Sequence, residues 1–176
     1  MRILSVITGA ALVLGLSATA QAKDMDGKWG FGGSFQSANL NQAPATTIDG
    51  IYWMGDLGLE GRLGFGLNAP DGGDTAVGFT GGLSLIYNFA KFDTVNVGIG
   101  LDVDGQLYSS GAEGADADIG ISFGIPLRGE YFFSDNFAAN ASVGLGVDIV
   151  TDPSVIAFGT RSAGAFGSFG FIWYMN

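Results

Sequence analysis

The segment 118–150 reads DIGISFGIPLRGEYFF, then SDN, then FAANASVGLGVDIV, and it decides the fold of the chain. Side chains of a β-strand point to alternate faces, and both runs divide into an apolar face and a small or polar face. The apolar face carries Ile119, Ile121, Phe123, Ile125, Leu127, Tyr131 and Phe133, then Phe137, Ala139, Ala141, Val143, Leu145, Val147 and Ile149. Ser134, Asp135 and Asn136 favour a turn, so the segment predicts an antiparallel hairpin.

Both runs are longer than ordinary strands, which usually have about 5–6 residues. The step from Phe137 to Ile149 covers roughly 40 Å at about 3.3 Å per residue. A strand tilted by about 40° would rise roughly 30 Å over that length, which matches the apolar layer of a bilayer. The hairpin is therefore typical of a transmembrane β-barrel.

The first 22 residues have the pattern of a secretory signal peptide. Arg2 is followed by an apolar stretch from Ile3 to Leu16, and Ala20-Gln21-Ala22 fits the small-x-small cleavage site. The apolar stretch is short for a membrane-spanning helix of about 20 residues. We expect cleavage after Ala22, which leaves residues 23–176 as one barrel domain.

Composition supports a membrane barrel and excludes several functions. Charged residues make up 14% of the chain, well below the usual share of about 25%, yet after the signal peptide no stretch has about 18 consecutive apolar residues. A barrel reconciles these facts, because its membrane signal is alternation. The net charge of −10 argues against nucleic-acid binding, and the chain has neither Cys nor His.

Alternation predicts eight strands along the chain, at Gly27–Gln36, Thr47–Met54, Leu57–Asn68, Ala76–Phe89, Val95–Tyr108, Asp118–Phe133, Phe137–Val150 and a last strand that runs to Tyr174. The second strand has an open register, since Ile51 and Trp53 fit one face while Ile48, Tyr52 and Met54 fit the other. The last strand turns Phe169, Phe171 and Trp173 to one face and Tyr174 to the other. Pro126 cannot donate to a strand ladder, and we expect a β-bulge there.

The links between these strands alternate in length. Short links are expected at Gly55-Asp56, Lys91–Thr94 and Ser134–Asn136, and longer ones begin at Ser37, Ala69, Ser109 and Thr151, the last running to Ala157. In bacterial outer-membrane barrels short turns are periplasmic and long loops extracellular. Aromatic residues gather near the short links and predict an interfacial girdle, made of Trp53, Tyr87, Phe89, Phe92, Tyr131, Phe133, Phe137, Trp173 and Tyr174.

The chain resembles the small eight-stranded outer-membrane barrels of the OmpA membrane-domain and OmpX type. The resemblance is carried by the signal peptide, by GIPLRGEYFFSDNF at 124–137 and by the aromatic-rich end FGFIWYMN. It implies a closed antiparallel up-and-down barrel in the bacterial outer membrane, in contact with lipid and lipopolysaccharide, inserted by the barrel-insertion machinery and monomeric. The family usually ends on an aromatic residue, whereas this chain ends Met175-Asn176.

The polar faces predict a charged lumen. They carry Glu60, Arg62, Asp102, Asp104, Arg128, Glu130 and Asp148, with Arg161 near the extracellular end. Side chains just fill the interior of an eight-stranded barrel, and unpaired buried charge is costly. We therefore expect Arg128 to pair with Glu60, Asp102 or Asp104. A structural plug of ion pairs is the favoured interpretation, and a gated polar pathway for ions is the alternative.

The sequence offers candidates for two other kinds of site, a cation site and a catalytic site. Asp71, Asp74, Glu113, Asp116 and Asp118 lie in two outer loops, where carboxylates could bridge divalent cations to lipopolysaccharide phosphates, but solvated loops are the preferred interpretation. Catalysis of the Ser–His type found in some outer-membrane barrels needs a base that is usually His. We expect no catalytic residues, no metal and no cofactor.

The favoured function is thus a non-catalytic outer-membrane barrel with a structural or surface-interaction role. A narrow channel or small-solute transporter is the first alternative. A soluble lipocalin-like barrel, with its apolar face turned inward to hold a ligand, is the second.

Overall fold

The computed structural model describes residues 23–36, 46–68, 74–112, 116–151, 154–160 and 167–175. The predicted signal peptide lies outside these residues. The strands are β1 (Trp29–Gln36), β2 (Thr46–Met54), β3 (Leu57–Asn68), β4 (Ala76–Lys91), β5 (Val95–Ser109), β6 (Asp118–Phe132), β7 (Phe137–Thr151), β8 (Ser154–Thr160) and β9 (Ser168–Met175). Within the described ranges, no helical segment has the length and apolar character of a membrane span.

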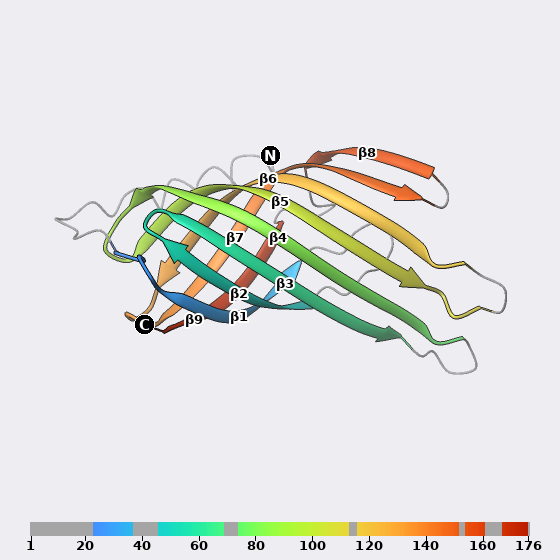
Figure 1. Ribbon diagram of the computed structural model, residues 1–176, viewed down its shortest axis with the longest axis horizontal. Coiled ribbons are helices and arrows are strands. Elements are labelled where there is room, and N and C mark those ends of the chain that lie inside the picture. Colours follow the sequence, from blue (N-terminus) through green and yellow to red (C-terminus); the bar gives the residue numbers. More distant parts are fainter. Residues whose placement is uncertain are drawn as a thin grey trace, which may run out of the picture.

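The strands close into an antiparallel barrel (Figure 1). Strands β1 to β7 pair in chain order. The second edge of β7 is shared, because residues 137–142 pair with β9 and residues 145–151 pair with β8. Strand β9 pairs with β1 along its whole length, and this pairing closes the ring. Closure matters because an open edge in lipid would leave backbone N–H and C=O groups unpaired.

Strands β8 and β9 are the two halves of one interrupted barrel strand. Both run antiparallel to β7 along the same edge, and only Val143 and Gly144 of β7 lie between the two paired stretches. Counted this way the barrel has eight strands, as the sequence predicted. The prediction of a loop from Thr151 to Ala157 is wrong. Strand β7 reaches Thr151, and this residue pairs with Ser154 at the start of β8. The small and apolar residues 154–160 read equally well as strand or loop, and pairing with β7 decides between them.

Two further details of the sheet differ from expectation. The register between β5 and β6 is the same on both sides of Pro126, with Ile99 opposite Leu127 and Asp102 opposite Gly124. Pro126 therefore causes no bulge. It interrupts the ladder to β5 locally and keeps its place opposite Gly144 of β7. The irregularity lies instead between β4 and β5, where the register shifts between Asn88 and Ala90.

The barrel is apolar outside and polar inside. Leu63, Leu83 and Leu101 are 72%, 62% and 60% exposed, and the same face of every long strand repeats this pattern. The residues that point inward are mostly Ser, Thr, Asn, Asp, Glu, Arg and Gly. This distribution is the reverse of a water-soluble protein, and it is the surface that a transmembrane barrel presents to lipid.

The register of β2 is settled by burial. Ile51 and Trp53 point into the barrel at 1% and 0% exposure, whereas Ile48 and Met54 point outward. Trp53 and Tyr174 were predicted for the interfacial girdle, and that prediction is wrong, since both are fully buried in the lumen. Tyr87, Phe89, Tyr131, Phe133 and Trp173 are 45–59% exposed at the end of the short links, hereafter the short-turn end.

Candidate functional site

The lumen is crossed by an ion pair between opposite walls. Arg128 of β6 donates from Nη1 to Glu60 Oε2 of β3. Strands β4 and β5 separate β3 from β6 in the sheet, so this contact spans the interior and does not follow the wall. Both side chains are buried, at 8% and 5% exposure. Arg128 thus contacts one of the three carboxylates predicted as its partners.

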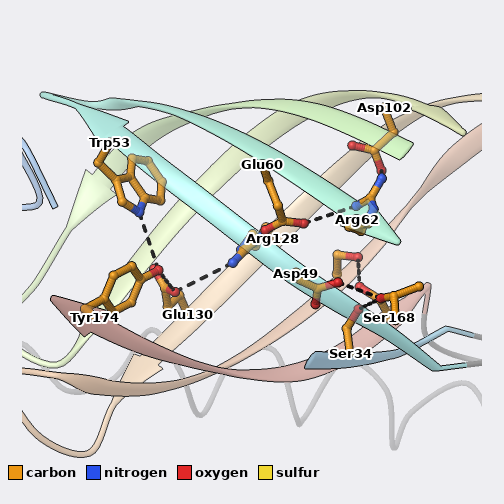
Figure 2. A network of polar contacts seen from close by, with 12 residues as sticks. Ser34, Asp49, Trp53, Glu60, Arg62, Asp102, Arg128, Glu130, Ser168 and Tyr174 are labelled. Carbon is orange, nitrogen blue, oxygen red and sulfur yellow. Dashed lines mark hydrogen bonds and ion pairs between the residues drawn. The ribbon is translucent and has the colours of Figure 1, made fainter. Parts of the chain in front are cut away.

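A second guanidinium group lies beside this pair (Figure 2). Arg62 Nη1 donates to Glu60 Oε1 at 3.3 Å, and Nη2 donates to Asp104 Oδ1 at 2.9 Å. Asp102 Oδ2 lies 3.7 Å from the same Nη2 atom. Glu60 therefore bridges two guanidinium groups, and Arg62 contacts carboxylates from both β3 and β5.

Gly82 makes the contact between Arg62 and Asp104 possible. It lies on β4 between these two residues, opposite both of them in the register. A Cβ at this position would overlap the Asp104 carboxylate. Because glycine leaves the inner wall of β4 bare here, side chains from two strands that are not neighbours can meet.

The network continues toward the short-turn end. Arg128 Nη2 lies 3.7 Å from Glu130 Oε1, and the Tyr174 hydroxyl donates to the same oxygen at 2.5 Å. Trp53 Nε1 donates to the Tyr174 hydroxyl at 3.4 Å. Buried Tyr and Trp side chains usually need a partner for their polar atoms, and here each has one while its ring packs among apolar neighbours.

A separate polar group lies on the β1–β2 side of the lumen. Thr47 Oγ1 donates to Asp49 Oδ1 at 2.6 Å and lies 2.7 Å from Ser34 Oγ. All three residues are buried, at 2–4% exposure. Ser142 and Ser168 share a hydrogen bond of 2.7 Å between the paired strands β7 and β9.

An apolar layer closes the lumen below the charged network, at the short-turn end. Its buried members share contact with one another and are Met25, Ile51, Trp53, Ile86, Phe132, Ala138, Ile172 and Tyr174. Glycine again provides space, since a Cβ at position 30 would come within 2.6 Å of Ile51, Ile172 and Tyr174. The lumen therefore holds two layers of different chemistry, one apolar and one ionic.

The structure brings together six of the seven predicted lumen residues, namely Glu60, Arg62, Asp102, Asp104, Arg128 and Glu130. Asp148 is half-buried on β7, and its Oδ1 atom has no hydrogen-bond partner among the described residues. Arg161, Asp71 and Glu113 lie outside the described residues. Among the residues that are described, no group of three or more His, Cys, Asp or Glu has an arrangement suited to a metal ion.

Carboxyl groups outnumber guanidinium groups in the described lumen. Asp49, Glu60, Asp102, Asp104 and Glu130 are buried, whereas the buried cations are Arg128 and the nearly buried Arg62. The ion pairs hold these charged side chains in place, and the described lumen has more carboxyl groups than guanidinium groups. Such a lumen favours cations over anions wherever it admits an ion.

Sequence reasoning missed several lumen residues, among them Met25, Asp49, Trp53 and Tyr174. Asp49 carried a usable signal, because a charged residue that alternates with Thr47, Ile51 and Trp53 assigns this face of β2 to the interior. Tyr174 had already been placed on the polar face of the last strand. Met25 carried no signal, because it precedes the first strand and is buried only by the closed barrel.

Comparison with known proteins yields a similarity of fold only. No protein-family model matches the chain, and no curated protein matches its sequence. Among solved structures, the chain is similar to Ail, the attachment invasion locus protein of Yersinia pestis, with a TM-score of 0.47 and 12% identity over 86% of this chain and 100% of that one.

Proposed function

We propose that this protein is a non-catalytic barrel of the bacterial outer membrane whose lumen is closed by ion pairs. The observation that carries the proposal is the contact of Arg128 with Glu60 across the interior, with Arg62 and Asp104 beside it. A wall-to-wall contact of buried charged groups occupies the space that a permeant ion would need. The role is then structural, or is exercised through the outer surface and the long loops.

The location in the outer membrane is supported by the inverted surface and by the signal peptide predicted from the sequence. Closed barrels in bacterial outer membranes have an even number of strands and short turns on the periplasmic side. In this proposal the short-turn end faces the periplasm. The barrel-insertion machinery, membrane lipid and lipopolysaccharide are its partners, and the barrel is a monomer.

The lipocalin-like alternative has little support from the geometry. A barrel that holds an apolar ligand needs an apolar lumen and a polar outer face. Here the lumen carries buried Glu60, Arg128 and Asp104, while Leu63 and Leu83 are exposed on the outside.

The narrow channel is the second candidate, and the acidic excess of the lumen favours it. Conductance across planar bilayers distinguishes the two candidates. We expect the purified wild-type protein to be almost silent, with at most brief openings, because the ion pairs must separate before an ion passes. A steady, voltage-independent conductance of the wild type would refute the closed barrel and favour the channel.

A further inference from the structure

The residues before β1 cross the mouth of the barrel at the short-turn end. This segment, Lys23–Lys28, is called the strap below. Its sequence KDMDGK has a single large apolar residue, Met25, flanked by charged residues on both sides. Met25 is 1% exposed, although nothing in the local sequence would bury it.

The strap contacts all three short links of the barrel. Lys23 N donates to Phe92 O in the β4–β5 link at 3.4 Å, and Lys23 Nζ contacts Asp135 Oδ1 in the β6–β7 link at 2.6 Å. At the β2–β3 turn, Gly55 N donates to Asp26 Oδ1 at 2.7 Å. Since β1 and the β4–β5 link lie on opposite sides of the ring, the strap passes over the opening.

A turn directs Met25 into the lumen. Lys28 N donates to Met25 O at 3.1 Å, and Gly27 has a φ of 72°, which glycine adopts without steric cost. The Met25 side chain then packs among Trp53, Ile172, Tyr174 and the other residues of the apolar layer. An unbranched thioether side chain suits this position because it adapts to an irregular gap.

Lys23 holds the far end of the strap. Its ammonium group lies 5.3 Å from the centre of the Phe132 ring, a cation–π distance. The hydrogen bond from Lys23 lowers the pKa of the Asp135 carboxyl group, and the positive charge of Lys23 lowers it further. The side chain of Asp135 is 91% exposed, so this ion pair lies at the water-facing rim.

We propose that the strap is a plug that seals the short-turn mouth, with Met25 as its stopper and Lys23 as its anchor. This goes beyond closure by ion pairs, because it concerns different residues and a different layer. The barrel then has two seals in series, an apolar one at the mouth and an ionic one above it. Either seal can be opened without the other.

The test measures how fast water-soluble reagent reaches the apolar layer. The chain has no cysteine, so Ala138→Cys introduces a single thiol on the inner face of β7, at a position that is 0% exposed. The folded protein in detergent micelles is treated with a charged maleimide, and the labelling rate is recorded. Folding is verified for each variant by its heat-modifiable migration on gels.

We expect slow labelling of Ala138→Cys alone and labelling at least about tenfold faster when Met25→Ala is added, because removal of the stopper lets water reach the layer. Met54→Ala is the matched control. Met54 is also a methionine near the short-turn end, but it is 48% exposed on the outer face, so its removal should leave the rate unchanged. Lys23→Ala and Asp135→Ala should each accelerate labelling, and their combination should add little, because both remove the same contact.

Three results would overturn the plug: rapid labelling with the strap intact, equal acceleration by Met25→Ala and Met54→Ala, or rates within about twofold of the parent for the strap variants. If Met25→Ala does not fold, the two anchor variants decide the matter. Labelling reports the mouth, and conductance of the Met25→Ala variant, in which the mouth is open, reports the ionic layer. Failure of this proposal is therefore distinguishable from failure of the closed-lumen function.

Discussion

At the scale of single residues, the lumen depends on where side chains are missing as much as on where they are present. Gly82 illustrates this, since Arg62 and Asp104 meet only because β4 has no side chain between them. Gly50 is a contrasting case, because it lies on the outer face of β2 and a Cβ there would meet nothing within 4 Å.

These two glycines predict opposite responses to alanine. Gly82→Ala should destabilise the barrel by about 1–3 kcal/mol, because the new methyl group displaces the Asp104 carboxylate in a filled interior. Gly50→Ala should be neutral within about 0.5 kcal/mol. Urea titration in lipid vesicles measures both. Equal effects of the two substitutions would show that the lumen has room to rearrange.

Arg128 gives the sharpest prediction for the ionic layer. Arg128→Ala should cost about 3–5 kcal/mol, because Glu60 and Glu130 lose a buried counter-charge. Adding Glu60→Gln should recover part of that loss, since one of the two carboxylates that lost Arg128 as a partner is then replaced by a neutral amide. The same vesicle titration applied to the wild type, both single variants and the double variant gives the coupling energy. Simple additivity would mean that the contact contributes nothing specific.

At the scale of elements, β7 takes part in the lipid face, in the lumen and in the pairing with the interrupted strand. Its inner face carries Asn140 and Ser142, and its outer face carries Val143 and Leu145 at 45% and 53% exposure. Its far edge pairs with both halves of the interrupted strand. A change on either face of β7 is therefore informative about the whole barrel.

Charge on the outer face of β7 should be poorly tolerated. Val143→Arg or Leu145→Arg, near the middle of the span, should each cost about 2–4 kcal/mol in lipid. Ser142→Ala, on the inner face, removes one hydrogen bond to Ser168 and should cost only about 1 kcal/mol. Folding in vesicles measures all three. If the arginine variants fold as well as the wild type, this face does not contact lipid.

At the scale of the whole molecule, the barrel has two distinct ends. The described links at one end are short, and the strap lies across that mouth. Among the described residues, the lumen above it carries more carboxyl than guanidinium groups. Orientation in the membrane and permeation through the lumen are the properties that belong to this scale.

Orientation is tested with protease-sensitive tags. A tag inserted at Gly72 or Gly114, in the long links, should be cut by protease added to intact cells. A tag at Asp93, in the β4–β5 link, should be protected, because the short turns face the periplasm. Cleavage at Asp93 with protection at Gly72 would show that the barrel has the opposite orientation in the membrane.

Two seals in series predict a non-additive effect on conductance. Arg128→Ala and Met25→Ala should each stay close to silent in planar bilayers, because the other seal remains in place. The combination should conduct, with selectivity for cations, since acidic groups dominate the lumen. Steady conductance of either single variant would show that one seal is absent from the folded barrel.

The sequence by itself determined the faces, the strand number and the membrane character of this protein. These follow from the two-residue period of a strand, which is local, so Ile119–Phe133 and Phe137–Ile149 could be assigned without knowledge of their neighbours. The charged lumen followed from the same period, because each of its six connected residues lies on the polar face of a long strand. The ambiguous assignment of the two faces of β2 could have been resolved by the same argument from Asp49.

Only the tertiary structure decided which side chains meet. Contact between Arg128 and Glu60 depends on the stagger of every strand from β3 to β6, a sum of registers around the ring that no local pattern contains. The division of the last strand into β8 and β9, the inward position of Trp53 and Tyr174 and the burial of Met25 have the same origin. Each depends on closure, which turns a sheet with two faces into a wall with an inside, and on the narrow lumen that closure creates.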